Sequence, residues 1–157
     1  MPFMPTFQPR AKLHEQPASS LVVFCSDHRF QAGIQEFLSQ GLRISEDCDL
    51  LVIPGGPQCL TLVEYLPKFS WAGWRWTRFL VDAHDLKRLV LIAHQDCGWY
   101  KELPMHLHNS TEPRKRQEQD MKRVQVAVAN ELPNLTIESY YASYDTMGNM
   151  AIEALTG

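Results

Sequence analysis

The sequence predicts an α/β protein, with a single domain built around a central, mostly parallel sheet flanked by helices. Short apolar runs rich in Val, Ile, Leu and Phe recur without polar alternation, which is typical of strands buried on both faces of a parallel sheet. Segments with helical spacing alternate with these runs, as they do in successive βαβ units. The 157 residues suit one domain, and 45% hydrophobic with 21% charged residues suits a globular protein.

Four strands are expected in chain order, at residues 21–24, 50–53, 87–93 and 135–143. Residues 150–155 are expected to form either an antiparallel edge strand or a short helix. With right-handed crossovers we expect the strand order 2-1-3-4. This order places the carboxyl ends of the first and third strands side by side, where open α/β sheets bind ligands.

Helices are predicted at residues 31–40, 71–83 and 112–132, with a shorter one at 60–66. The helix at 71–83 is expected to bury one apolar stripe, formed by Ala72, Trp76, Phe79, Leu80 and Ala83. Trp71 and Trp74 lie off this stripe. These two residues either cap the edge of the core or, if exposed together, mark a subunit interface.

The helix at 112–132 has one apolar face and many charges elsewhere. The apolar face is formed by Met121, Val124, Val128 and Leu132. The charged residues are interpreted as a solvated face made of Arg114, Lys115, Arg116, Glu118, Asp120, Lys122 and Arg123.

The first 20 residues are expected to form an arm outside the α/β domain, which would span 21–157. The arm holds four prolines and little periodicity, so it is either a loose terminus or a segment that wraps a partner subunit. The net charge of -3 gives no reason to expect a nucleic-acid partner. No apolar run approaches the ~20 residues that cross a bilayer. Without a secretory signal, a cytoplasmic protein is expected.

Three potential metal ligands follow two of the expected strands. Cys25 ends the first apolar run, and His94 and Cys97 follow the third. Because these strand ends are neighbours in the expected order, we expect the three side chains to lie close together. Two thiolates and an imidazole suit zinc (Zn²⁺) rather than magnesium or calcium, and three protein ligands leave a fourth position for chemistry. In a chain with four cysteines, metal or catalytic use is favoured over a disulfide framework.

Two short motifs carry a resemblance to a known family. Residues 25–29, Cys-Ser-Asp-His-Arg, resemble the Cys-x-Asp-x-Arg motif of the β-class carbonic anhydrases. Residues 94–98, His-Gln-Asp-Cys-Gly, resemble the His-x-x-Cys-Gly motif of the same family. The motifs occur in the family's order, each at the end of a buried strand, and the similarity extends from about residue 16 to the end of the chain.

The resemblance implies a zinc lyase that reversibly hydrates carbon dioxide to bicarbonate. Zinc would be held by Cys25, His94 and Cys97, with hydroxide in the fourth position of an active site or Asp27 there in a closed one. Zinc lowers the pKa of bound water to about 7. Arg29 would pair with Asp27, draw it off the metal and keep it ionised to accept a hydrogen bond from the hydroxide. The plainer alternative is that Asp27 and Arg29 form only a structural ion pair.

The resemblance also implies a substrate pocket at a subunit interface. Gln16, Phe79 and Gly98 match its lining positions, and the first two could serve a neighbouring subunit's site. We therefore expect a homodimer or a larger homo-oligomer. Asp96 is expected either to orient a metal ligand or to cap a helix.

Three departures from the family pattern affect the expected pocket. Residues 54–57, Pro-Gly-Gly-Pro, replace an Arg-Asn-Ala-Gly-like turn, His28 replaces a small serine, and Trp99 stands where a small residue is common. Other readings therefore stay open. They are a related hydrolase of carbonyl sulfide or carbon disulfide, a silent zinc protein closed by Asp27, and a metal-free protein with Cys25 as a nucleophile.

Overall fold

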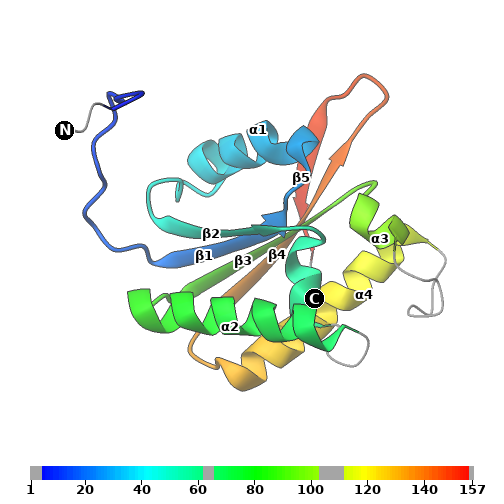
Figure 1. Cartoon of the computed structure of the whole chain (residues 1–157). Helices are drawn as coiled ribbons and strands as arrows, with labels where there is room; N and C mark the ends of the chain where they lie inside the picture. Colours follow the sequence, from blue (N-terminus) through cyan, green and yellow to red (C-terminus); the bar gives the residue numbers. More distant parts are fainter. Residues whose placement is uncertain (1–4, 62–65, 103–111, 156–157) are drawn as a thin grey trace.

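The computed structural model describes residues 5–61, 66–102 and 112–155. Within these residues, five strands form one sheet in the order β2-β1-β3-β4-β5 (Figure 1). The strands are β1 (Ser20–Cys25), β2 (Cys48–Ile53), β3 (Arg88–His94), β4 (Thr136–Tyr144) and β5 (Met150–Ala154). β1 to β4 pair in parallel, and β5 runs antiparallel to β4 at one edge. The predicted α/β class and strand order are confirmed, and residues 150–154 form the edge strand rather than a helix.

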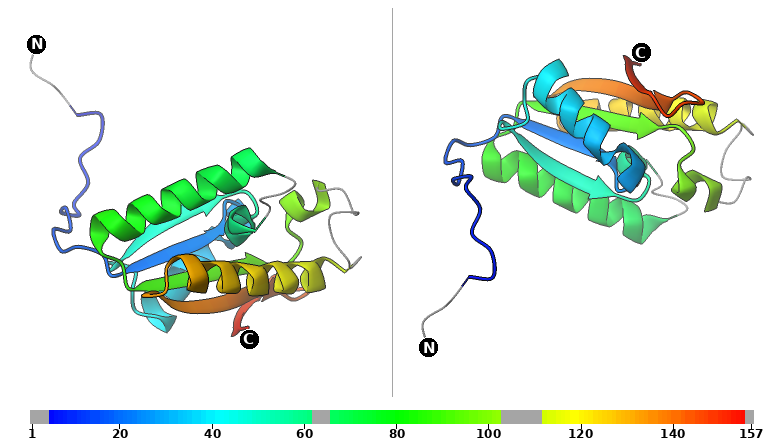
Figure 2. Two further views of the ribbon diagram at one scale, coloured as in Figure 1. Left: turned by 90° about the horizontal axis from the view of Figure 1, so that it is seen from below. Right: turned by 90° about the horizontal axis from the view of Figure 1, so that it is seen from above.

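Helices cover both faces of the sheet. α1 (His28–Glu36) and the π-helix η1 (Phe37–Gly41) lie on one face, and α2 (Pro67–His84) and α4 (Pro113–Glu131) lie on the other (Figures 1 and 2). Two short helices lie near the carboxyl ends of the strands, the 3-10 helix η2 (Gly56–Leu60) and α3 (Gly98–Glu102).

β1 shows why its sequence is apolar at every position. Val22 and Phe24 pack under α1, whereas Leu21 and Val23 face the core beneath α2 and α4. All four side chains are fully buried. Each such burial stabilises the fold by about 1.5–3 kcal/mol, so the strand is fixed from both sides and its carboxyl end is held in place.

The buried face of α2 differs from the predicted apolar stripe. Ser70, Gly73 and Thr77 are buried, whereas Trp76 and Phe79 are 45% and 58% exposed. A Cβ atom added to Gly73 would lie 2.6 Å from Cys59 Sγ. Small residues therefore face inward because they let α2 approach η2 closely, and the predicted orientation of this helix is wrong.

α4 buries its apolar face as predicted, but not all of its charges are solvated. Met121, Val124 and Val128 are buried. Arg116 and Asp120 are also buried, at 5% and 1% exposure, so the solvated-face interpretation is wrong for these two residues.

The remaining segments frame the sheet. Residues 5–19 contain no helix or strand; the early part of this segment runs away from the body of the protein (Figures 1 and 2), whereas Ala18 packs against the core and Ser19 bonds to Asp47. η2 ends at Leu60, where the predicted helix at 60–66 begins, and residues 62–65 of that prediction lie outside the described part of the chain. Among the described residues, no helix has the length and apolar character that crossing a bilayer requires.

Candidate metal centre

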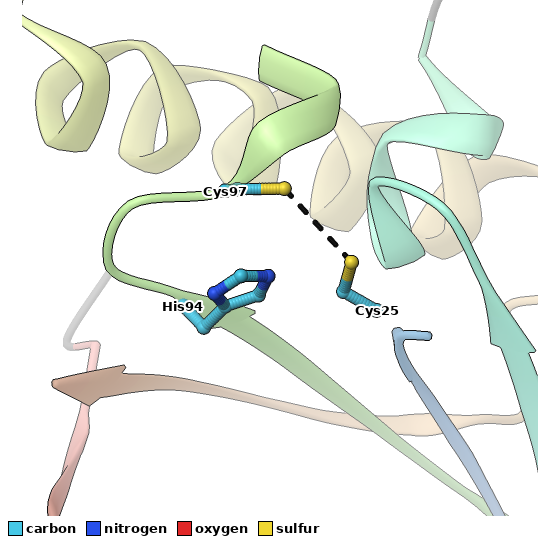
Figure 3. A group of neighbouring side chains, drawn as sticks. All are labelled: Cys25, His94 and Cys97. Atoms are coloured by element: carbon cyan, nitrogen blue, oxygen red, sulfur yellow. Dashed lines mark hydrogen bonds between the residues drawn. The ribbon is translucent and has the colours of Figure 1, made fainter. Parts of the chain in front are cut away.

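The three predicted ligands meet at the carboxyl ends of β1 and β3. Cys25 is the last residue of β1 and His94 the last of β3, and these strands are direct neighbours. Cys97 lies in the turn before α3. The three side chains point toward one another (Figure 3), with Cys25 Sγ 3.9 Å from Cys97 Sγ and all three donor atoms within 4.8 Å. All three residues are buried, at 7%, 2% and 2% exposure.

The hydrogen bonds of His94 leave one ring nitrogen for a metal. His94 Nδ1 lies 2.8 Å from the carbonyl oxygen of Gln95, and because a carbonyl only accepts, Nδ1 carries the proton. His94 Nε2 is then an acceptor, yet it is buried without a hydrogen-bond partner among the described residues. A buried acceptor of this kind is expected of a metal ligand whose other nitrogen is held by the backbone. The Phe30 ring, 4.3 Å from the imidazole, packs against it.

The two thiols form a pair with unequal proton affinities. The hydrogen bond from Cys97 lowers the pKa of Cys25, burial opposes this shift, and the backbone N–H groups of Asp27 and Gly55 add smaller lowering contributions. The same contact raises the pKa of Cys97. Two sulfurs bound tetrahedrally at about 2.3 Å from one zinc would lie about 3.8 Å apart. The observed separation of 3.9 Å and the N/S donor set therefore fit zinc.

The turn after β2 packs directly against the centre. Gly55 and Gly56 have φ angles of 76° and 51°, in the left-handed region that favours glycine. A Cβ atom on Gly56 would lie 2.8 Å from the backbone nitrogen of Cys25, and one on Gly55 would lie 2.3 Å from Cδ1 of Trp99. The Pro-Gly-Gly-Pro sequence of residues 54–57 is thus explained by close approach of the turn to β1 and to Trp99.

Asp27 and Arg29 form a two-point ion pair beside the centre. Arg29 Nη2 lies 2.7 Å from Asp27 Oδ2, and Arg29 Nε lies 3.1 Å from Oδ1. Asp27 also caps α1 by accepting from the backbone N–H of Arg29. Hydrogen bonding to Arg29 lowers the pKa of Asp27 from 3.8 to about 2, so the carboxylate is charged at neutral pH.

Solved structures with the same architecture come from carbonic anhydrases. A carbonic anhydrase from Glaciozyma antarctica superposes with a TM-score of 0.56 at 17% identity, covering 88% of this chain and 83% of that one. A tetrameric β-carbonic anhydrase from Sordaria macrospora gives a TM-score of 0.56 at 12% identity, covering 90% and 82%. This chain has the β-carbonic anhydrase fold.

Sequence comparison adds a relative without a described activity. An uncharacterized protein from Rickettsia bellii is 23% identical over 135 residues, which cover 82% of this chain and 78% of the relative. No protein-family model matches the chain. The assignment to the β-carbonic anhydrase fold therefore comes from the three-dimensional comparison.

Within this fold, the three predicted pocket residues lie in different places. Gly98 directly follows Cys97 and begins α3. Gln16 lines a cavity with Asp49 and His84 near the amino ends of β1 and β2, whereas Cys25 lies at the carboxyl end of β1. Phe79 lies on the exposed side of α2. One copy of the chain thus brings only Gly98 to the metal ligands, and the pocket roles of the other two stay predictions that involve a second copy.

Asp96 lies between the ligand motif and the Asp27–Arg29 pair. Its backbone has a φ of 58°, in the left-handed region. Its carbonyl oxygen accepts from Arg29 Nη2 at 3.1 Å, and its carboxylate faces Arg29, Lys101 and the hydroxyl of Tyr144. Asp96 therefore ties Arg29 to the turn that carries Cys97.

Polar residues of α4 also reach the centre, which the sequence analysis did not anticipate. Gln117 Nε2 donates to the carbonyl oxygen of His94 at 2.8 Å, and Asp120 accepts from Tyr100 on α3. Both α4 residues continue the stripe of Met121 and Val124 at helical spacing. That spacing is the sequence signal that could have placed them on the buried face.

Proposed function

We propose that this protein is a zinc-dependent lyase that reversibly hydrates carbon dioxide to bicarbonate. The observation that carries the proposal is the buried convergence of Cys25, Cys97 and the unpartnered Nε2 of His94 at neighbouring strand ends. The β-carbonic anhydrase fold supports it, because solved proteins with this architecture carry that activity in their names. Zinc held by these residues supplies an activated water, with a pKa of about 7, at a fourth position.

In this proposal Asp27 accepts a hydrogen bond during the reaction, and Arg29 keeps the Asp27 carboxylate charged and in position. Asp27 remains ionised because Arg29 neutralises it at two points, so its carboxylate can accept a hydrogen bond from the attacking oxygen. The same ion pair holds Asp27 away from the metal position, which favours an open site over the closed, silent alternative. His28 is exposed beside Asp27 and is placed to pass a proton to solvent.

Self-association belongs to the same proposal. The outer side of α2 exposes Trp71, Trp76 and Phe79, and large aromatic residues are enriched at protein interfaces. Phe7 and Leu13, in the segment that precedes β1, are 81% and 87% exposed. A homo-oligomer of at least two copies would cover these surfaces and bring Gln16 or Phe79 to a neighbouring centre.

The test is a stopped-flow carbon dioxide hydration assay on protein of known metal content. Wild-type protein is expected to hold one zinc per chain and to hydrate carbon dioxide, and Cys25→Ala to lose both properties. Cys48→Ala is the matched control, because Cys48 lies at the opposite end of the sheet from the ligands and should keep both. If the zinc-loaded wild type turned over carbonyl sulfide or carbon disulfide but not carbon dioxide, the related hydrolase would be favoured. If the purified wild-type protein did not bind zinc, the proposal would be wrong.

A further inference from the structure

Three hydrogen bonds link η2 and α4 to α3, the helix that begins directly after Cys97. Trp99 Nε1 donates to Gln58 Oε1 at 2.7 Å, and Gln58 Nε2 donates to Asp120 Oδ2 at 2.9 Å. The hydroxyl of Tyr100 donates to the same carboxylate oxygen at 2.9 Å. Because Trp99 and Tyr100 are adjacent in α3, these three bonds join η2, α4 and α3 in one circuit.

The chemistry of the groups fixes the direction of every bond in this circuit. An indole N–H only donates and a carboxylate only accepts, so the Gln58 amide has one orientation that satisfies both neighbours. Gln58 and Asp120 are each 1% exposed, and Tyr100 is 4% exposed. At such burial a lost partner leaves a polar group without water to replace it, so the circuit is maintained as a unit.

Two of the segments joined by the circuit, η2 and α3, lie next to the two cysteines. Gly56, the first residue of η2, packs against the backbone of Cys25, where an added Cβ would lie 2.8 Å from the Cys25 nitrogen. Tyr100 is buried in one cluster with Cys25 and Cys97, and Trp99 packs against that cluster. The buried carboxylate of Asp120 thus connects the environment of one sulfur to that of the other.

We propose that Asp120 is a positioning residue that sets the separation of the Cys25 and Cys97 sulfurs and thereby the affinity for zinc. The inference rests on the proposed function only in taking zinc as the group held by the three ligands. Residues that orient metal ligands without binding the metal themselves typically contribute 10- to 100-fold to metal affinity. Asp120 acts here through Gln58, Trp99 and Tyr100, without a contact to the metal position itself.

Zinc affinity, measured by competition with a chromogenic chelator, tests the role of Asp120. Asp120→Ala is expected to weaken zinc binding by about 10- to 100-fold. Asp120→Asn keeps an acceptor for Gln58 and Tyr100, and it should restore most of the affinity. Glu118→Gln is the matched control on the same helix, because Glu118 pairs with Arg114 on the surface, and it should bind zinc as wild type does.

Further measurements separate positioning from simple destabilisation. Cobalt(II) substitution reports thiolate coordination by its absorption, and Asp120→Ala should weaken the cobalt–thiolate band whereas Asp120→Asn should retain it. If Asp120→Ala does not fold, Tyr100→Phe removes one donor of the circuit and should weaken zinc binding by about 10-fold, the low end of this range.

The outcomes distinguish this inference from the proposed function. A wild-type chain that binds no zinc overturns both. Wild-type binding with unchanged affinity in Asp120→Ala, even with a lower melting temperature, overturns the positioning role alone. Equal loss of affinity in Asp120→Asn and Asp120→Ala would also overturn it, because the retained acceptor would then have no effect.

Discussion

Arg29 donates hydrogen bonds to both carboxylate oxygens of Asp27, with Nη2 2.7 Å from Oδ2 and Nε 3.1 Å from Oδ1. Arg29 is in turn hydrogen-bonded to the backbone of Asp96, one residue before the proposed ligand Cys97. The orientation of Asp27 is therefore coupled to the turn that supplies a metal ligand, and substitutions of Arg29 should affect activity without removing a ligand.

Arg29→Lys is expected to reduce carbon dioxide hydration by about 100-fold at neutral pH, the low end of contributions from proton-handling groups. A lysine ammonium cannot reproduce the two parallel bonds of a guanidinium, so Asp27 is free to turn toward the metal. Zinc content should remain at one per chain, as measured by metal analysis. Full activity in this variant would show that the ion pair has only a structural role.

The stability contribution of Asp27 should depend on pH in a defined direction. Its pKa in the folded protein is lowered to about 2, below the usual 3.8, so the charged form favours folding. The contribution is fully present above about pH 4 and is lost as the pH falls toward 2.

Urea unfolding of zinc-free protein measures this effect. Asp27→Asn keeps the helix cap and should be less stable than wild type at pH 6, with the difference shrinking toward pH 2. A difference that stays constant across this range would mean that the charge of Asp27 does not contribute.

Gly56→Ala is expected to destabilise the protein by about 1–3 kcal/mol and to weaken zinc binding. The new Cβ would lie 2.8 Å from the backbone nitrogen of Cys25, at a φ of 51° that L residues rarely adopt. Thermal unfolding and chelator competition measure the two effects. Gly98→Ala is the control for stability, since a Cβ there meets nothing within 4 Å, and its stability should change by less than about 0.5 kcal/mol.

Phe79→Ser should weaken self-association if α2 forms the subunit interface. Loss of a large aromatic anchor at an interface typically costs about 2 kcal/mol or more, which corresponds to a roughly 30-fold weaker association constant. Sedimentation velocity across a concentration series would measure this change. Met147→Ser is a suitable comparison, because Met147 is 85% exposed between β4 and β5, and its association should match that of wild type.

The strand pattern and the convergence of Cys25, His94 and Cys97 were predictable because they depend on local sequence. Each buried strand is a continuous apolar run, and Cys25 and His94 are simply the residues at which two runs end. Parallel strands align these ends automatically, so the spatial convergence required no knowledge of side-chain packing.

The errors arose where packing between elements decides which residues are buried. α2 presents Ser70, Gly73 and Thr77 to η2 because close contact excludes larger side chains, although Trp76 and Phe79 are more apolar. Charge alone predicts an exposed Asp120, whereas the two hydrogen-bond donors that meet its Oδ2 atom, Tyr100 and Gln58, are 20 and 62 residues away in sequence. Such long-range partners have no signature in one segment alone.

Cys25 and Cys97 lie 72 positions apart, and the intervening chain forms α1, β2 and α2 before it returns as β3 beside β1. A nascent or partly folded chain therefore offers at most an isolated thiol, or the His94–Cys97 half of the site, which is a weak chelate. In the proposed zinc protein, tight metal binding becomes available only after the long-range pairing of β1 with β3 is complete. Zinc supply should then affect the stability of the folded protein rather than the rate at which new chains fold.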